Sequence, residues 1–364
     1  MKKVIVCLAL LGLASSSPVK KELGIKEVFK DDFKIGTAVN LAQVTGKEPG
    51  ADSLMSFHFN SLTPENGLKW ALVHPEKERF DFAFGDAFVE KGKALNAYLV
   101  GHTLVWHQQT PKWVFEEMEG KEASFELLKS RMENHIQEVV GRYRGKIHAW
   151  DVVNEAFEDD GSWRQTPWFR ILGPEFIEMA FRKAHQIDPN AKLLYNDFNV
   201  WKPEKLDAIL SMCAMLKNKG VRIDGIGMQG HYRLEVPKID QIEQAIIKIH
   251  QAGLEVHFTE LDVDVLPRPS DQEGADLTLN YAQSPEWNPY PDQLPQQVEA
   301  KLVKRYVELF QLFRKHADKI ERVTFWGLTD QTSWLNNWPV RGRTNYPLLF
   351  DREKNLKSGF IGSF

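Results

Sequence analysis

The chain has 364 residues, of which 43% are hydrophobic and 26% are charged, and its formal net charge at pH 7 is −4. These values are typical of a soluble globular protein, and so small a net charge cannot steer a charged partner over a long distance. No basic patch of the kind that binds nucleic acid occurs, and no apolar stretch is long enough to span a bilayer. We therefore expect neither a nucleic-acid partner nor a membrane anchor in the mature form.

The first residues have the composition of a secretory signal. A basic start at residues 1–3 is followed by an apolar run and then by small residues up to Ser17, which is the order found in such signals. We expect residues 1–17 to be cleaved and residues 18–364 to form a secreted or periplasmic domain. Cys7 has no Gly, Ala or Ser immediately before it, which argues against a lipid anchor at this position.

Apolar runs that end in polar clusters recur eight times, and each has the length of a buried strand. They cover residues 34–40, 57–66, 98–106, 147–155, 192–199, 225–232, 255–263 and 322–330. Amphipathic helical patterns lie between most of them, and no linker divides the chain. This alternation predicts a single α/β domain, a (β/α)8 or TIM barrel.

Several helices can be placed from their apolar spacing. Apolar side chains three and four residues apart predict one helix from Ser124 onward and another over residues 298–313. Asp240 with Glu243 resembles a capping box at the start of a third helix. In a further helix Cys213, the one cysteine of the mature chain, lies on the apolar face, where we expect an inert core thiol.

Two segments depart from the regular alternation. Residues 264–295, between the seventh strand and its helix, contain six prolines and three aromatic residues. A loop of this length is usually functional or disordered, and its place after the seventh strand favours a cleft wall. Few residues follow 348–351, so we expect an abbreviated C-terminal end instead of a normal eighth helix. Truncation, an irregular closure or burial against another molecule could each account for it.

Two glutamates occupy matching positions in this pattern. Glu155 closes the run at 147–155, and Glu260 lies in the run at 255–263. In a barrel of parallel strands the chemistry sits at the carboxyl ends, because the strand-to-helix loops converge there. Glycoside hydrolysis needs two carboxyl groups in one cavity, since one protonates the leaving oxygen and the other attacks or activates water. An isolated glutamate would more often form an ion pair, but two matching sites favour catalysis.

Amide, imidazole and indole side chains follow most of the other strands. Such groups suit sugar recognition, because polar side chains bind hydroxyl groups and aromatic rings stack on the apolar faces. A single strand-end Asn or Gln often caps the next helix, but capping does not explain so many strand ends. The expected sugar contacts at these positions are Glu65, Asn66, Lys69, His102, Trp106, Tyr195, Gln229, His231, Trp326 and Trp334.

All of these residues except Tyr195, together with the two glutamates, lie in specific motifs at 63–70, 101–107, 150–155, 228–231 and 259–262 or are Trp326 and Trp334. In order, spacing and flanking residues they resemble glycoside hydrolase family 10, the endo-β-1,4-xylanases. The resemblance extends from about residue 34 to residue 351. It implies a retaining hydrolase on a (β/α)8 barrel that cuts internal β-1,4-xylosidic bonds, with its two carboxyl groups roughly 5 Å apart.

The resemblance also implies roles for individual residues. Glu155 matches the acid/base and Glu260 the nucleophile, while Asn154 matches the residue that binds the 2-hydroxyl group of the sugar under attack. His231 and Asp262 match the groups that keep the nucleophile ionised. The other expected site residues are His107 behind the cavity and the glycone-side contacts Asn66, Lys69, His102, Trp106, Gln229, Trp326 and Trp334.

Other classes of protein fit the sequence less well. A β-1,4-glucanase or mannanase would need room for a C5 hydroxymethyl group, and a non-catalytic sugar-binding protein would not need both glutamates. A metal hydrolase built on His102, His107, His231 and His257 is disfavoured, because no dense ligand set with metal spacing occurs. A serine hydrolase would need a Gly-x-Ser-x-Gly elbow, which is absent. We expect a monomer that acts on a polysaccharide without a metal or other cofactor.

Overall fold

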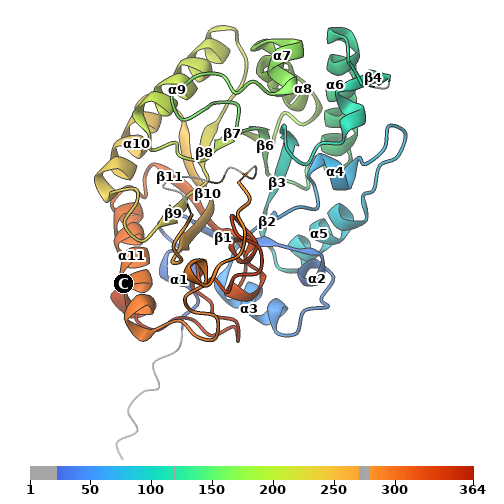
Figure 1. The fold of residues 1–364 in the computed structure, drawn as a ribbon. Helices are drawn as coiled ribbons and strands as arrows, with labels where there is room; N and C mark the ends of the chain where they lie inside the picture. The colour runs from blue at the N-terminus through green and yellow to red at the C-terminus, as the bar shows by residue number, and fades with distance from the viewer. Residues whose placement is uncertain (1–22, 119, 270–274, 276, 278) are drawn as a thin grey trace, which may run out of the picture.

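The computed structural model describes residues 23–364 except 119, 270–274, 276 and 278. The expected signal sequence at 1–17, with Cys7, lies outside the described residues. Eight parallel strands close into a barrel, which confirms the predicted (β/α)8 class (Figure 1). These strands are β1 (Lys34–Val39), β2 (Ser61–Pro64), β3 (Tyr98–Val105), β6 (Ala149–Asn154), β7 (Lys192–Asp197), β8 (Gly225–Met228), β10 (Glu255–Asp264) and β11 (Ile320–Phe325).

The strands follow one another around the barrel in chain order, and pairing of β11 with β1 closes it. A short additional strand, β9 (His231–Arg233), pairs with the end of β10 so that His231 lies opposite Asp262. Because the barrel strands are parallel, their carboxyl ends meet at one end of the barrel.

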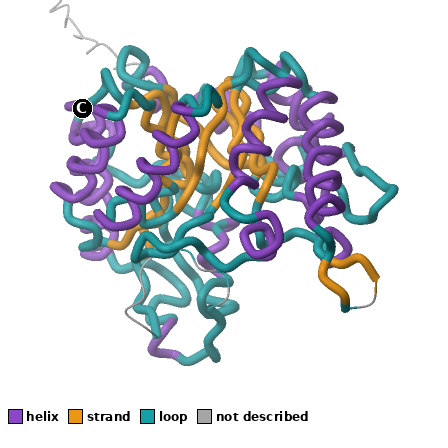
Figure 2. Tube along the Cα trace, turned by 90° about the horizontal axis from the view of Figure 1, so that it is seen from above, coloured by secondary structure: helices purple, strands orange, loops and turns teal. Residues whose placement is uncertain are grey.

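Helices surround the barrel, and long loops project from one end of it (Figure 2). The α-helices are α1 (Ile25–Val28), α2 (Leu41–Val44), α3 (Ala51–His58), α4 (Trp70–Val73), α5 (Ala83–Ala94), α6 (Phe125–Arg142), α7 (Pro167–Leu172), α8 (Glu175–Ile187), α9 (Pro203–Asn218), α10 (Ile239–Gln251) and α11 (Gln296–Lys315). Short 3-10 helices are η1 (Lys112–Val114), η2 (Pro285–Trp287), η3 (Asp330–Thr332), η4 (Trp334–Asn336) and η5 (Ile361–Ser363), and a hairpin joins β4 (Glu116–Met118) to β5 (Lys121–Glu122).

The expected helix after Ser124 is α6, and its first turn is capped by the Ser124 side chain, which accepts a hydrogen bond from the amide of Leu127. The expected helix over 298–313 lies within α11. Cys213 is buried on α9 as a free thiol, and burial raises its pKa to about 12. A thiol that keeps its proton in the core is unreactive, as predicted.

The two faces of a barrel strand bury different side chains, because side chains alternate along a strand. On β7, Tyr195 belongs to the core between the barrel and the helices. Leu194 instead packs with Val100 and Ala149 in a separate cluster inside the barrel. Asn196 follows Leu194 by two residues and therefore faces the barrel interior. This alternation decides which residues of β7 reach the site.

Two of the expected local features were wrong. Residue Phe57 was placed in the second strand, but it lies in α3, where Ala51, Leu54, Met55 and His58 are buried at helical spacing. The strand begins only at Ser61.

The capping box of Asp240 and Glu243 was also wrong. Helix α10 begins at Ile239, and Oε1 of Gln241 accepts the hydrogen bond of the Lys238 amide at 2.9 Å. Glu243 instead binds His316, the residue that follows α11, with 2.7 Å between Oε1 and Nε2. The cap therefore starts two residues earlier than the sequence pattern indicated.

The C-terminal end closes the fold without a covering α-helix among the described residues after β11. The ring of Phe360 lies 5.1 Å from that of Phe310, and the ring of Phe364 lies 5.0 Å from that of Phe29. The last residues thus pack on α11 and on the segment that follows α1. An irregular closure is one of the three expectations stated above, and the described residues show such a closure.

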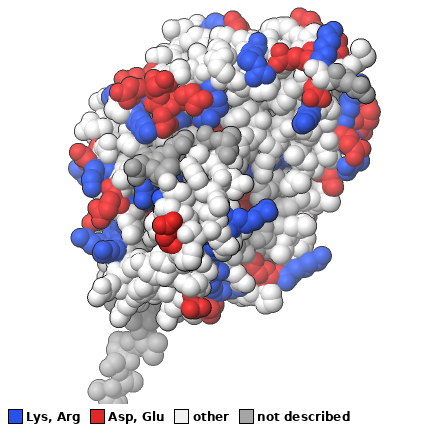
Figure 3. All heavy atoms as spheres, in the orientation of Figure 1, with Lys and Arg blue, Asp and Glu red and all other residues white. Residues whose placement is uncertain are grey.

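The surface has no dominant charge on the face seen in Figure 3, where acidic and basic side chains are intermixed. This matches the small formal net charge of −4. Within the described part of the chain, no helix combines the length and the apolar character needed to cross a membrane.

Candidate active site

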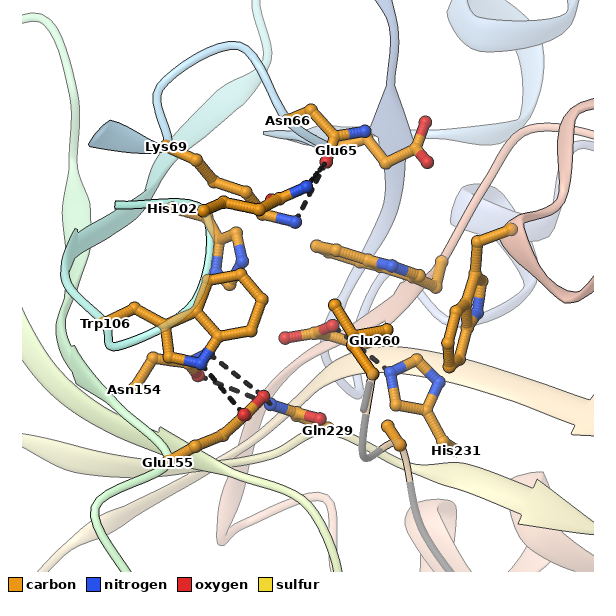
Figure 4. Close-up of a pocket in the computed structure, with 15 residues that line it drawn as sticks. Glu65, Asn66, Lys69, His102, Trp106, Asn154, Glu155, Gln229, His231 and Glu260 are labelled. Atoms are coloured by element: carbon orange, nitrogen blue, oxygen red, sulfur yellow. Dashed lines mark hydrogen bonds and ion pairs between the residues drawn. The ribbon is translucent and has the colours of Figure 1, made fainter. Parts of the chain in front are cut away.

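The strand ends open into a cavity of about 220 Å³ at one end of the barrel. Glu155 and Glu260 point into it from β6 and β10, and Figure 4 shows them with their neighbours. The cavity is lined by Glu65, Asn66, Lys69, His102, Trp106, Gln109, Asn154, Glu155, Gln229, His231, Glu260, Ala275, Leu277, Trp326 and Trp334.

Glu155 follows directly after β6 and is only 4% exposed. Three donors hold its carboxyl group. Nε1 of Trp106 lies 2.9 Å from Oε2, while Nε2 of Gln229 lies 2.9 Å and Nδ2 of Asn154 lies 3.1 Å from Oε1. The side chain is therefore fixed in one orientation toward the cavity.

Glu260 lies within β10 and is 5% exposed. Its Oε1 accepts a hydrogen bond from Nδ2 of Asn196 at 2.8 Å, and its Oε2 lies 3.2 Å from Nε2 of His231. Burial alone would raise the pKa of Glu260, but the hydrogen bond from His231 and the positive charges of His102, His231 and Lys69 together lower it. Glu260 is thus held as a carboxylate.

His231 connects Glu260 to a second carboxylate. Its Nδ1 lies 2.9 Å from Oδ1 of Asp262, and Nε1 of Trp334 donates to Oδ2 of the same Asp262 at 2.7 Å. Burial would lower the pKa of His231, but Asp262 and Glu260 raise it to about 9. At neutral pH the imidazole is therefore a cation placed between two carboxylates.

Asn196 links the surroundings of the two glutamates. Its Nδ2 donates to Oε1 of Glu260 and to Oδ1 of Asn154, both at 2.8 Å, and its Oδ1 accepts from the hydroxyl group of Thr259 at 2.6 Å. A Cβ atom on Gly227 would lie 2.2 Å from Oδ1 of Asn196, so this position requires glycine. The close packing fixes Asn196 in its bridging position.

Lys69 supplies a buried cation on the opposite wall. Its Nζ donates to Oδ1 of Asn66 at 3.0 Å and lies 5.0 Å from the ring centroid of Trp106 and 5.9 Å from that of Trp326. Burial lowers its pKa, and the charges of Glu260, Glu65 and Glu155 oppose that effect. Both candidate glutamates therefore face the same cation.

The structure brings together almost all of the predicted sugar contacts: Glu65, Asn66, Lys69, His102, Trp106, Asn154, Gln229, His231, Trp326 and Trp334 line the cavity with the two glutamates. Asp262 lies behind His231, as expected. His107 does not line the cavity, and its ring meets that of Trp106 edge-on at 6.0 Å.

Tyr195 was wrong as a sugar contact. Its side chain is fully buried on the outer side of β7, and its hydroxyl group accepts a hydrogen bond from the amide of Ala156 and donates one to Asp197. The next residue, Asn196, reaches the site instead. The predicted position was off by one residue, which on a strand changes the face.

Some residues that form the site are not marked by any motif in the sequence. Ala275 and Leu277 line the cavity, so part of the long loop after β10 is a cleft wall, as predicted, but neither of these apolar residues belongs to a motif. Gln109 also lines it. The sequence also does not identify Asn196, the register partner of Asn154 on the neighbouring strand, because it does not show which residue of β7 faces inward.

The two histidines that line the cavity, His102 and His231, both contact carboxylates. Nδ1 of His102 lies 2.9 Å from Oδ2 of Asp151, and His231 lies between Glu260 and Asp262. Across the described residues, no group of three or more His, Cys, Asp or Glu side chains is arranged to hold a metal ion. The chemistry that the site offers is acid–base and nucleophilic, from two carboxyl groups with different partners.

A (β/α)8 barrel with two carboxyl groups, amides and indole rings in one cavity has the architecture of a barrel glycoside hydrolase. Comparison with protein families matches residues 24–362 to glycosyl hydrolase family 10. The chain belongs to this family.

Individual relatives agree over nearly the whole chain. Endo-1,4-beta-xylanase A of Xylanibacter ruminicola is 42% identical over 351 residues, covering 96% of this chain and 95% of that protein. An endo-1,4-beta-xylanase of Geobacillus stearothermophilus is 41% identical, covering 92% of this chain and 96% of that protein.

Solved structures share the fold closely. A GH10 endoxylanase retrieved from a sugarcane soil metagenome has a TM-score of 0.90 at 46% identity, covering 93% of this chain and 99% of that chain. A mutant protein in complex with xylotriose has a TM-score of 0.84 at 36% identity, covering 94% of this chain and 99% of that chain.

Proposed function

We propose that this protein is an endo-β-1,4-xylanase that hydrolyses internal bonds of xylan with retention of configuration. Glu260 is the nucleophile and Glu155 the acid/base. The observation that carries the proposal is the contrast between the two carboxyl groups, which share one cavity but have different partners. Glu260 is held ionised by His231 and Asn196, whereas Glu155 is bound by neutral indole and amide donors.

In the first step Glu260 attacks the anomeric carbon, and the bond to the leaving oxygen breaks. Glu155 gives its proton to that oxygen, so that the departing sugar leaves as a neutral alcohol. The products are a glycosyl ester of Glu260 and a Glu155 carboxylate. In the second step Glu155 takes a proton from water, whose oxygen attacks the same carbon and releases Glu260. Two inversions at one carbon give net retention.

The surroundings of the two glutamates support these roles. Asn154, which donates to Glu155, is placed to bind the 2-hydroxyl group of the sugar under attack. Lys69 and Asn66 face the cavity as donors to sugar hydroxyl groups, and the rings of Trp326 and Trp334 offer faces for stacking. These groups suit a neutral saccharide.

The choice of xylan rests on relatives. Two proteins that are 42% and 41% identical are named endo-1,4-beta-xylanases, and one solved neighbour is a complex with xylotriose. A parallel product analysis on linear xylan, carboxymethylcellulose and mannan tests it. We expect short xylo-oligosaccharides from xylan and no products from the other two. Cleavage of carboxymethylcellulose or mannan at a comparable rate would overturn the substrate assignment.

We also propose that residues 1–17 direct export, because their basic, apolar and small order is that of a secretory signal. Expression in a bacterial host followed by N-terminal sequencing of the exported protein tests this. A mature N-terminus near residue 18 supports export, and retention of residue 1 in the cytoplasm contradicts it.

A further inference from the structure

Glu155 has an unusual backbone conformation for its residue type. Its φ is 58°, in the left-handed region that residues with a side chain seldom adopt. Such a conformation persists only where the surrounding structure enforces it. Because the chain turns at this residue, the direction of its carboxyl group depends on how firmly the neighbouring peptides are held.

Both peptide groups around Glu155 are held by β7. This strand lies beside β6 in the barrel (Figure 1). The Glu155 amide donates to the carbonyl oxygen of Asn196 at 2.9 Å. The following amide, of Ala156, donates to the hydroxyl oxygen of Tyr195, also at 2.9 Å. The first contact is an ordinary backbone bond, but the second depends on one side-chain hydroxyl group.

That hydroxyl group is itself oriented. Tyr195 donates its hydrogen to Oδ2 of Asp197 at 2.5 Å, which leaves the oxygen lone pairs for Ala156. Burial, followed by the negative charge of Asp197, raises the pKa of Tyr195 well above its usual range, so the hydroxyl group keeps its hydrogen. The direction of both hydrogen bonds is therefore fixed. Ala156 donates to Tyr195, and Tyr195 donates to Asp197.

Asp197 is in turn held by a buried cation. Nζ of Lys205, a fully buried residue on α9, lies 2.8 Å from Oδ1 of Asp197 and 3.4 Å from Oδ1 of Asp159. Asp159 belongs to the same loop as Glu155, and Lys202 also binds it, at 2.7 Å. The buried lysine thus ties β7 to the loop that begins at Glu155.

We propose that Tyr195 is a positioning residue for Glu155. Its hydroxyl group, oriented by Asp197 and Lys205, fixes the peptide of Ala156 and thereby aims the Glu155 carboxyl group at the leaving oxygen. Tyr195 does not line the cavity, so it acts only through Glu155. The inference rests on the proposed acid/base role of Glu155 and adds a residue to it.

The test uses Tyr195→Phe, which removes only the hydroxyl group, and aryl β-xylobiosides with leaving groups of different acidity. Proton donation matters most for poor leaving groups. We expect kcat/KM for the phenyl substrate to fall about tenfold or more, and that for the 2,4-dinitrophenyl substrate to change less than about twofold. The plot of log kcat/KM against leaving-group pKa should become steeper.

A matched control is Tyr143→Phe. Tyr143 is 1% exposed, and its hydroxyl group also donates to a carboxylate, that of Asp86. Tyr143 follows α6 and Asp86 lies on α5, so neither residue lines the cavity. This variant should keep the wild-type slope. In a Glu155→Ala background, adding Tyr195→Phe should have no further effect on kcat/KM, because the group through which Tyr195 acts is gone.

An equal loss of kcat/KM on all leaving groups, or an undiminished effect of Tyr195→Phe in the Glu155→Ala background, would overturn the proposal. If Tyr195→Phe does not fold, Asp197→Asn becomes the test variant. This substitution keeps Tyr195 but removes the negative charge that orients its hydroxyl group. That variant should show the same dependence on leaving group to a smaller degree, and an unchanged slope would count against the proposal. A wild-type protein without activity on aryl xylobiosides would instead contradict the proposed function.

Discussion

The side-chain nitrogen of Asn196 lies 2.8 Å from Oε1 of Glu260 and donates a hydrogen bond to it. The same nitrogen donates to Asn154, whose own amide donates to Glu155. A chain of two amides therefore joins the two glutamates across β6, β7 and β10. Both side-chain amide hydrogens of Asn196 have an acceptor, Glu260 and Asn154, so the relative placement of the two carboxyl groups is held by the protein itself.

Replacing Asn196 should disturb both carboxyl groups at once. In Asn196→Ala, both Glu260 and Asn154 lose the hydrogen bond that Asn196 donates to them. We therefore expect kcat/KM on xylo-oligosaccharides to fall about tenfold to a hundredfold. Steady-state kinetics checks this. Asn355→Ala is the control, since that amide binds only Asp351 in an exposed loop, at 3.2 Å. A value for Asn196→Ala within about twofold of the control would show that the bridge has no role in catalysis.

The two glutamates should respond differently to truncation. Glu260→Ala removes the attacking group and should abolish hydrolysis of xylan, without recovery of a retained product when azide is added. Glu155→Ala should keep turnover of aryl glycosides with good leaving groups, because these need no proton. The comparison is made on xylan and on a 2,4-dinitrophenyl glycoside. Equal losses on both substrates in Glu155→Ala would contradict its acid role.

The acidic limb of the pH profile should depend on His231. Glu260 must be ionised to attack, and its lowered pKa keeps it ionised in moderately acidic solution. Activity is therefore lost as the pH falls through that pKa. In His231→Asn the strongest stabiliser of the carboxylate is removed, while Lys69 and His102 still face it, so the pKa of Glu260 rises and the acidic limb of kcat/KM moves to higher pH.

His316→Asn is the control for that shift. His316 also binds a glutamate, Glu243, at 2.7 Å, but outside the cavity. It should leave the acidic limb in place. A limb that does not move in His231→Asn, or that moves equally in both variants, would show that His231 does not set the ionisation of Glu260.

The irregular C-terminal closure should depend on one buried ion pair. Nζ of Lys357 lies 2.6 Å from Oδ2 of Asp330, and burial raises the pKa of Asp330 to about 6. Lys357→Met leaves that carboxylate unpaired, so we expect the free energy of unfolding to fall by about 3 to 5 kcal/mol at neutral pH.

The sign of the pH dependence follows from Asp330. Its folded pKa is raised above the ordinary value of 3.8, so the folded state binds the proton more tightly and loses stability as the pH rises from about 4 to about 6. Without Lys357 this effect grows. In urea unfolding, the loss of unfolding free energy in Lys357→Met relative to the wild type should be smaller near pH 5 than near pH 7. A loss that does not depend on pH would contradict this explanation.

The sequence was sufficient to predict the barrel and most of the cavity, because the end of each strand is marked by a change from apolar to polar residues. Glu155, Glu260 and the residues of the motifs around them stand at such changes. What it could not supply was the register of β7. The run Leu193–Leu194–Tyr195 is apolar on both faces, as in strands buried on both sides, so no alternation marks which residue turns inward.

For the same reason the role of Tyr195 was not visible in the sequence. A tyrosine beside Asn and Asp at a strand end is equally compatible with a sugar contact and with a buried hydrogen bond. Only the positions of Ala156 and Asp197 around its hydroxyl group distinguish the two. The cavity wall at Ala275 and Leu277 depends likewise on the path of a long loop, which composition does not encode.

If Glu260 is the nucleophile, it forms a covalent bond to the sugar and Glu155 does not. A 2-deoxy-2-fluoro-β-xylobioside with a good leaving group slows both steps and allows the intermediate to accumulate, after which peptide mass mapping locates the label. We predict a single label on the peptide that contains Glu260. A label on Glu155, or no covalent adduct while the protein still hydrolyses xylan, would contradict the account.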